Sequence, residues 1–141
     1  MAERTDVAAR EAENIWLRRT IAGVPVPAGF IVSEFCDWFL IVQGGLPSDA
    51  AGGGTELAIG GYHRANVAHN VATFGPLGTI GANQIPFDFG TPVADGPNIE
   101  AAGFSNASGV LVAWKPLNSL LQVRQNVPLI FAPGSITWQE D

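Results

Sequence analysis

Two histidines are the first residues of this chain that could do metal chemistry. His63 and His69 both lie in the segment Tyr62–His69. Positions six apart on a strand point to the same side, but at ~3.3 Å per residue they are about 20 Å apart. That separation excludes a shared metal ion on a continuous strand, and no cysteine or acid nearby completes a cluster. The chain also lacks the closely spaced His-x-His pair of the cupins, which are jelly rolls. We therefore predict two surface or interface histidines and no metal site.

Cys36 is the one cysteine of the chain, so an intramolecular disulfide and a cysteine zinc cluster are both excluded. It lies in the apolar run Phe35–Phe39, which favours a small buried thiol. A catalytic thiolate needs a histidine beside it, and the sequence does not bring His63 or His69 to this position.

Other nucleophile and phosphate-binding patterns are equally incomplete. The segment Gly52–Glu56 is rich in glycine but lacks the Gly-Lys-Ser/Thr ending of a phosphate-binding loop, so we predict an ordinary loop. No Gly-x-Ser-x-Gly elbow is present. Ser105 and Ser108 are expected in a turn, without the partners of a catalytic triad.

Three carboxylates could in principle form the acid pair of a glycosidase: Asp88, Asp95 and Glu100. A glycosidase needs two of them on either side of a sugar bond, and the sequence does not show such a pairing. Acids near turns in an acidic chain are usually solvated. We therefore predict no catalytic residue and no cofactor, and we expect a protein that is not an enzyme.

Residues 2–21 have the pattern of an N-terminal helix. Thr5 or Asp6 can cap it, and Gly23, Pro25 and Pro27 are expected to end it. Six residues of this segment fall on one face at helical spacing: Val7, Ala8, Ala12, Ile15, Trp16 and Arg19. We predict a helical arm over residues 1–23 and an extended, proline-rich connector over residues 24–29, because residues before proline avoid the helical region.

Residues 30–141 are predicted to form one β-sandwich domain. The expected strands are Phe30–Val32, Trp38–Val42, Tyr62–Val71, Gln84–Phe89, Ile99–Phe104, Gly109–Trp114, Leu120–Val123 and Leu129–Trp138. Short strands separated by Gly, Pro and Asn turns are typical of an antiparallel sandwich or jelly roll. Trp114, Phe131 and Trp138 are expected between the sheets. The fold class is therefore mainly β, with one N-terminal α-helix.

Composition excludes several classes of protein. Of 141 residues, 47% are hydrophobic and only 14% are charged, with 17 glycines and 10 prolines. Such a chain is too apolar to be disordered, and too rich in glycine and proline for a helical bundle. Residues 20–141 contain only three basic residues against nine acidic ones, so no basic stripe is present and we expect no nucleic-acid partner. The charged N-terminus does not have the pattern of a secretory signal. The longest apolar run, Phe30–Val42, is interrupted by Glu34 and Asp37, so no membrane partner is expected.

Four segments together resemble a known family. Gly53–Arg64 contains Gly-Gly-Thr-Glu, a few small residues and then Gly-Gly-Tyr-x-Arg. Ile85–Phe87 is similar to an Ile-x-Phe strand, Val110–Trp114 follows an Asn/Ser-Gly turn, and Val127–Thr137 ends in a Phe-x-x-Gly-x-Ile pattern. These features, with the N-terminal helix, resemble small virion proteins of tailed bacteriophages that are often labelled tail-fibre proteins.

The resemblance implies a structural virion protein on the particle surface, made in the host cytoplasm and without an active site. Its implied partners are other virion proteins, either major capsid or tail proteins, and copies of itself in a homo-oligomer, with a trimer expected. In one placement it is a capsid decoration or cement protein with an apolar face against the shell. In the other it is a fibre or collar component of the tail that touches host glycans through aromatic side chains. The short chain favours cement. A carbohydrate-binding module and an enzyme are the remaining alternatives.

The proposed arm carries the predicted partner-binding residues. They are Ile15, Trp16, Leu17, Arg18 and Arg19. An apolar stripe beside a stiff connector predicts that they are partly buried against another subunit. The alternative is a helix folded back over its own sandwich.

Overall fold

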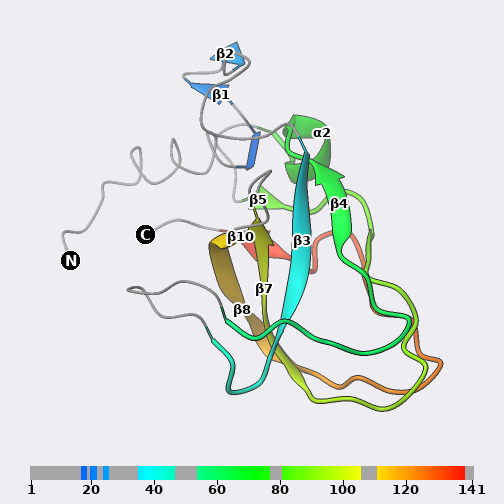
Figure 1. Cartoon of the computed structure of the whole chain (residues 1–141). Coiled ribbons are helices and arrows are strands. Elements are labelled where there is room, and N and C mark those ends of the chain that lie inside the picture. Colours follow the sequence, from blue (N-terminus) through cyan, green and yellow to red (C-terminus); the bar gives the residue numbers. More distant parts are fainter. Residues whose placement is uncertain are drawn as a thin grey trace. The chain divides into compact units, whose positions relative to one another are not determined.

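The computed structural model describes residues 17–18, 20–21, 24–25, 35–46, 54–76, 81–105 and 111–138 (Figure 1). The elements in chain order are β1 (Thr20–Ile21), β2 (Val24–Pro25), β3 (Phe35–Val42), β4 (Ala65–Ala68), α2 (Val71–Phe74), β5 (Gly81–Ala82), β6 (Phe87–Asp88), β7 (Ile99–Ser105), β8 (Leu111–Leu121), β9 (Ile130–Phe131) and β10 (Thr137–Trp138). The pairs β1–β2, β5–β10, β6–β9, β3–β7 and β7–β8 are antiparallel. The prediction of a mainly β, antiparallel protein is confirmed.

The chain divides into two compact units that are discontinuous in sequence. The first unit comprises Met1–Phe35, Ala68–Pro86 and Ala132–Asp141, and the second comprises Cys36–Val67 and Phe87–Phe131. The chain therefore passes from one unit to the other four times.

The second unit is built around a four-stranded sheet in the order β4-β3-β7-β8 (Figure 1). The aromatic and β-branched residues of β3 favour an extended strand, and alternate side chains of a strand point to opposite faces. On one face, Trp38 is fully buried and its ring lies 5.5 Å from that of Phe87 and 5.1 Å from that of Phe104. On the other face, Phe39 and Ile41 cluster with Ala101. Both faces of β3 are thus covered.

Strand β8 is the irregular edge of this sheet. Pro116 is opposite Ala101, and Leu121 is opposite Ile99. Four residues, 117–120, therefore face only Glu100, which makes a wide bulge. The sequence predicted two strands here, Gly109–Trp114 and Leu120–Val123, because a proline normally ends a central strand. An edge strand tolerates proline, so the two predicted strands are one. Trp114 packs against the Phe39–Ile41 cluster.

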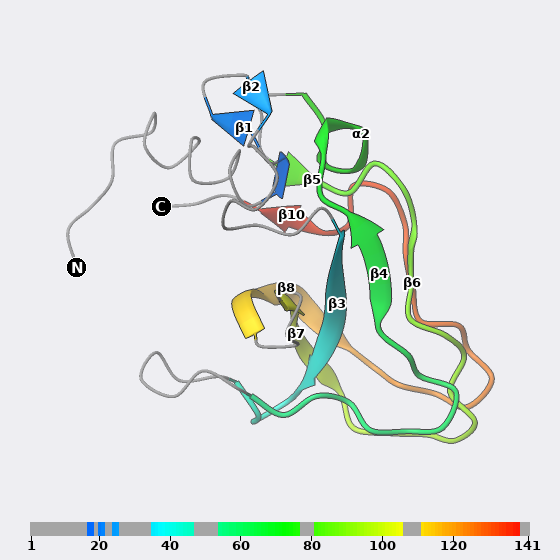
Figure 2. The same cartoon turned by 45° about the horizontal axis from the view of Figure 1, so that its top comes forward.

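The first unit contains β1, β2, α2, β5 and β10 (Figure 2). Asn70 caps α2, because its side-chain oxygen accepts a hydrogen bond of 3.0 Å from the Thr73 amide. After the helix, the Gln84 amide donates to the Thr73 carbonyl over 2.7 Å. β5 pairs with β10 in the register Ala82 to Thr137.

Asn83 joins β5 to the turn before β10. Its side chain is fully buried. The amide nitrogen donates to the carbonyls of Ile85 and Ala132, each over 2.9 Å, and the side-chain oxygen accepts from the Ile136 amide over 2.9 Å. All three bonds lie within the first unit.

Several predicted boundaries are wrong for local reasons. The helix predicted over residues 2–21 lies outside the described residues up to residue 16. Leu17 and Arg18 are in a π-helical turn, but Thr20–Ile21 is a strand that pairs with Val24–Pro25. Both strand residues are β-branched, which favours extended backbone. The helix that is described, α2, begins at Val71, where a strand was predicted, because Asn70 caps it.

The C-terminal prediction is wrong in a similar way. The strand expected over Leu129–Trp138 is two strands, β9 and β10, since a turn at Pro133–Gly134 separates them. Gly134 has φ +84°, which favours glycine. The predicted strand Phe30–Val32 and the side chain of Trp138 lie outside the described residues.

Candidate functional site

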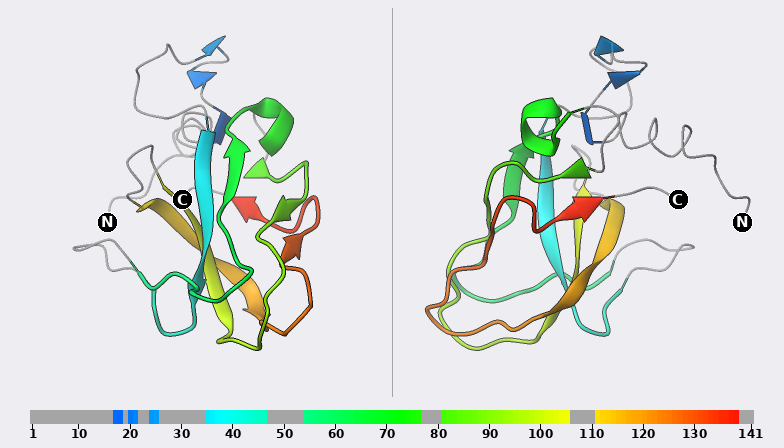
Figure 3. Two further views of the ribbon diagram at one scale, coloured as in Figure 1. Left: turned by 45° about the vertical axis from the view of Figure 1, so that its right-hand side comes forward. Right: turned by 180° about the vertical axis from the view of Figure 1, so that it is seen from behind.

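Three extended segments of the second unit, over residues 54–64, 89–98 and 122–129, run side by side (Figure 3). Backbone hydrogen bonds connect them. The Val93 amide donates to Gly60 over 3.0 Å, the Asn126 amide to Pro92 over 2.9 Å, and the Gly96 amide to Val123 over 3.1 Å. These segments are therefore a connected layer, although little of it is regular strand.

Two glycines allow the segments to come this close. Gly61 and Gly90 have φ of +87° and +92°, a region that side-chain-bearing residues rarely adopt. A Cβ atom at Gly61 would overlap the carbonyl oxygen of Thr91, and one at Gly90 would overlap that of Gly61. The second glycine of the Gly-Gly-Tyr motif thus allows the backbones of two segments to pack closely against each other.

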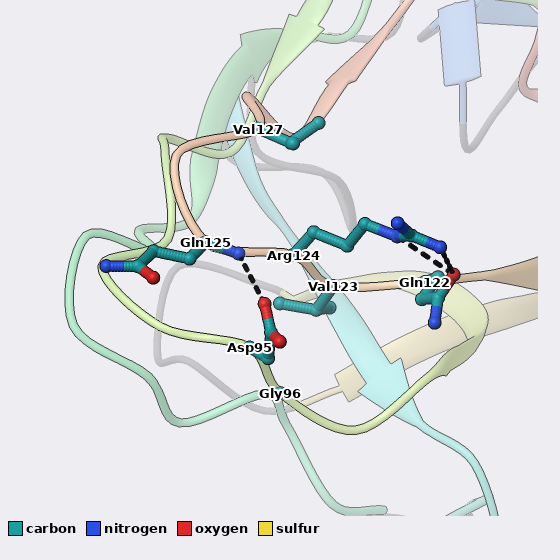
Figure 4. Close-up of a pocket in the computed structure, with 7 residues that line it drawn as sticks. All are labelled: Asp95, Gly96, Gln122, Val123, Arg124, Gln125 and Val127. Carbon is teal, nitrogen blue, oxygen red and sulfur yellow. Dashed lines mark hydrogen bonds between the residues drawn. The ribbon is translucent and has the colours of Figure 1, made fainter.

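An open groove of about 570 Å³ lies at the edge of this layer (Figure 4). Its lining residues are Asp95, Gly96, Gln122, Val123, Arg124, Gln125 and Val127. The Gln125 amide donates to Asp95 Oδ1 over 2.8 Å, and Gly96 bonds to Val123, so both walls are fastened to each other. We call the surface formed by residues 93–96 and 122–127 the loop face.

The loop face carries two opposite charges that do not meet. Arg124 Nε and Nη2 donate to Gln122 Oε1 over 3.0 and 2.6 Å. Asp95 accepts the Gln125 amide. Within the described part of the chain, neither residue forms an ion pair, and both side chains are exposed. The two charges of the groove therefore balance. Asp95 is bonded to Gln125, whereas the Arg124 guanidinium is bonded to Gln122 (Figure 4).

Apolar side chains adjoin these charges. Val93 is 60% exposed and Val127 is 49% exposed. The bond from Asn126 to Pro92 holds their segments together. Asn126 itself has φ 61°, a left-handed conformation that asparagine tolerates better than most residues. The arrangement can bind a partner by contact, and it offers no nucleophile.

A second polar cluster connects residues 56–64 to β3. Tyr62 donates to Glu56 Oε2 over 2.8 Å and accepts from the Leu40 amide over 3.1 Å. Burial raises the pKa of the Tyr62 hydroxyl far above its ordinary value, and the hydrogen bond to Glu56 raises it further. Arg64 makes two bonds of 2.9 Å to Glu56, which raise the pKa of its guanidinium, and lies 4.6 Å above the Phe39 ring.

These contacts fasten a loop rather than poise a reaction. Glu56 accepts from both Tyr62 and Arg64, and Tyr62 also stacks on Phe89. Sequence reasoning missed the cluster, although Glu56, Tyr62 and Arg64 lie in the Gly-Gly-Thr-Glu and Gly-Gly-Tyr-x-Arg motifs. Their spacing of six and eight residues gives no sign that they meet.

Two of the predicted partner-binding residues are buried within the chain itself. Leu17 is fully buried and Arg18 is 2% exposed. Arg18 donates to the carbonyls of Gly75 and Phe74, over 3.1 and 3.3 Å, where a cation is favoured by the C-terminal carbonyls of a helix. Ile15, Trp16 and Arg19 lie outside the described residues. The contacts of Arg18 therefore lie within the first unit, and whether the arm binds a neighbour or folds back over its own sandwich stays a prediction.

The prediction for the histidines is wrong in one case. His63 is exposed, and its Nδ1 lies 2.9 Å from the Arg64 carbonyl oxygen. His69 is only 1% exposed and packs edge-on against Phe74, with ring centres 5.1 Å apart. Phe74 lies five residues further along the sequence, at the end of α2, where the strand prediction for Tyr62–Val71 did not anticipate a helix. The burial of Cys36, at 3% exposure, is confirmed.

The three acids considered for glycoside chemistry all bind backbone amides instead. Asp88 accepts the Gly90 amide over 2.8 Å, Asp95 the Gln125 amide, and Glu100 the Gly44 amide over 3.0 Å. In the described ranges, no three His, Cys, Asp or Glu residues are placed to hold a metal.

Ser105 is fully buried at the end of β7 and donates to the Asp37 carbonyl, so its predicted place in a turn is wrong. Ser108 and the glycines at positions 52 and 53 lie outside the described residues.

Among the residues described, none of the helical structure has the length and apolar character needed to cross a bilayer. No protein-family model, curated protein or solved structure matches the chain.

Proposed function

We propose that this protein is a structural component of a tailed-phage virion, a capsid cement or decoration protein that binds the particle surface through subunit contacts. The observation that supports this best is the loop face. It combines exposed valines, few charges and fastened walls, and it contains no arrangement for catalysis among the described residues. Surface with few charges loses little hydration energy when it is covered by a neighbour.

The finer fold is part of the same proposal. We infer a sandwich or jelly-roll arrangement of the strands, and an N-terminal helical arm. The sheet of the second unit supports a layered arrangement, because β3 carries buried aromatic side chains on both of its faces. A solution structure of the whole chain tests the inference directly, through long-range contacts between the sheets and through the helical content of residues 1–16.

The second candidate is a fibre or collar component of the tail that binds glycans. The groove favours it, since sugar hydroxyls need both donors and acceptors, and Arg124, Asp95, Gln122 and Gln125 offer both. However, none of the seven lining residues is aromatic, although the resemblance implied aromatic contacts. A glycan array on the purified protein separates the candidates: specific binding supports the tail component, and its absence favours cement.

Location in the particle tests the main proposal. Particles made by the genome that encodes this chain are purified, and the protein is quantified against the major capsid protein. Many copies, in fixed proportion to the shell, are expected for cement. A few copies indicate the tail, and absence from purified particles refutes a virion role.

The arm is tested by deletion of residues 1–22. Since Leu17 and Arg18 are buried within the first unit, we expect the truncated protein to lose stability, measured by thermal unfolding. A truncated protein that stays folded but no longer joins particles would instead show that the arm binds a neighbour.

A further inference from the structure

We propose that copies of this chain associate through the loop face, with Asp95 of one copy paired with Arg124 of the next. The occupant of the groove is thus a second copy of the same chain. This inference does not depend on the virion role, because it concerns the purified protein alone. It names a surface for the expected homo-oligomer, to which the sequence assigned no residues.

The charges of the loop face are complementary between two copies of the chain. The loop face carries one carboxylate and one guanidinium, both exposed, and neither has an ionic partner among the described residues. In a closed symmetric oligomer, every copy contributes both groups, so each Asp95 can meet an Arg124 of a neighbour. All ionic groups of the face are then paired, two pairs in a dimer and three in a trimer.

Hydrogen bonds hold each of the two charged groups in place, apart from the other. Asp95 is fixed by the Gln125 amide and Arg124 by the side chain of Gln122. Arg124 bonds to Gln122 through Nε and Nη2 only, so its Nη1 remains available to a carboxylate. Groups that are ordered before binding lose less conformational entropy when the complex forms.

The loop face also has an apolar part. Val93 and Val127 are 60% and 49% exposed, and both lie on segments adjoining the two charges. Burial of such side chains in a neighbour is favourable, whereas opposite charges at the same place set orientation and exclude wrong partners. Together they describe an interface with an apolar part and a specific polar part.

Other surfaces of the described residues are less suited to self-association. The outer edge of β8 carries Lys115 and Pro116 and is interrupted by the bulge at residues 117–120, all features that block edge-to-edge pairing. β4, the opposite edge of the sheet, has only four residues. The loop face has no such protection.

Charge reversal tests the proposal. Four forms of the full chain are compared by sedimentation over a series of concentrations: the natural protein, Asp95→Arg, Arg124→Asp and the double variant. We expect the natural chain to associate, and each single reversal to weaken association at least about tenfold, because it places like charges opposite each other. The double variant restores pairing with the charges exchanged, so it should recover most of the association.

Two further variants separate this effect from misfolding. Asp95→Asn keeps an oxygen that can accept the Gln125 amide but removes the charge, so it should remain folded and associate more weakly. Val127→Ser should weaken association. Val71→Ser is its control: Val71 is similarly exposed, at 40%, but it belongs to the first unit and not to the loop face, so this variant should associate as the natural chain does. Circular dichroism checks the folding of every variant.

The result that would overturn the proposal is equally definite. A natural chain that is monomeric at all concentrations excludes the interface. So does an oligomer that both single reversals leave as stable as that of the natural chain, or a double variant that associates no better than the single ones. None of these three outcomes would bear on the presence of the protein in virions, which the quantification in purified particles decides separately.

Discussion

Replacing Asn83 with alanine should strongly destabilise the first unit. The side chain is fully buried and makes three hydrogen bonds of 2.9 Å. The variant leaves the Ile136 amide without its acceptor in a place where Ile136 is only 6% exposed. An unpartnered buried amide costs about 1–3 kcal/mol.

The other two partners lose less. Ile85 and Ala132 are exposed, so their carbonyls can turn to water, and each lost bond costs roughly 0.5–1 kcal/mol. The total is about 2–5 kcal/mol, or a factor of about 30 to several thousand in the opening equilibrium. Gln84→Ala is the matched control, because this neighbouring side chain is exposed and makes one bond, of 3.1 Å to the Ala82 carbonyl. We expect it to cost less than about 0.5 kcal/mol.

Amide hydrogen exchange measures the loss where it occurs. The Gly134 amide donates to the backbone carbonyl of Asn83, and this bond does not involve the side chain, so it remains in the variant. Its protection should fall by the factor given above in Asn83→Ala and stay nearly constant in Gln84→Ala. Equal protection of Gly134 in both variants would refute the view that Asn83 joins β5 to the C-terminal turn.

Asn83→Asp adds a dependence on pH. The new carboxyl keeps an acceptor for Ile136 but points an oxygen at two carbonyl oxygens, and burial disfavours its charged form. Its folded-state pKa is therefore raised, so the variant is most stable at acidic pH and loses stability as pH rises through the folded pKa. A variant that gains stability from acidic to neutral pH would contradict this reasoning.

Three further predictions concern the second unit. Gly90→Ala should lower the free energy of unfolding, measured by urea denaturation, by at least about 1–2 kcal/mol more than Gly134→Ala does. Both glycines have positive φ, but an added Cβ would meet the Gly61 carbonyl oxygen at Gly90 and nothing within 4 Å at Gly134. Equal losses of stability in the two variants would disprove the close packing at Gly90. Tyr62 is the only tyrosine of the sequence, and burial raises the pKa of its hydroxyl. Phenolate absorbance should therefore appear only as the protein unfolds, and the stability of the fold should fall as pH rises above about 10. Reversible titration of Tyr62 near pH 10 in the folded protein would contradict this. Cys36 is 3% exposed, so a thiol reagent should modify it only at the rate of opening, and immediate reaction of the native protein would show an open site.

The elements that the sequence predicted well are those that local residue types determine. Trp38–Val42 is a run of strand-forming residues and lies within β3. Ile99–Phe104 also lies within an observed strand, β7, although only its two end residues are strong strand formers. Boundaries failed where one side chain or one neighbouring strand decides them. Asn70 starts a helix inside a predicted strand, and Pro116 is tolerated because β8 happens to be an edge. Neither fact is visible in a window of sequence.

The groove could not have been found from the sequence. In the sequence, Asp95 is one acid near a turn and Arg124 is one of three basic residues in residues 20–141, and 29 positions separate the two. Their proximity depends on the pairing of two irregular segments through the bonds from Asn126 to Pro92 and from Gly96 to Val123. The sequence showed the glycine motif only as a family signature. Its physical role is to let two segments of the chain pack closely, because glycine has no Cβ atom.

The order in which the chain visits its two units also has a mechanical meaning. Met1–Phe35 and Ala132–Asp141 both belong to the first unit, while both segments of the second are internal. A force applied to the two ends of this chain is therefore transmitted first through the first unit, including the Asn83 bonds and the β5–β10 pair. The second unit, with its sheet and its loop face, bears load only after the first has opened. A protein tethered in this way can yield under tension at one unit and keep the other intact.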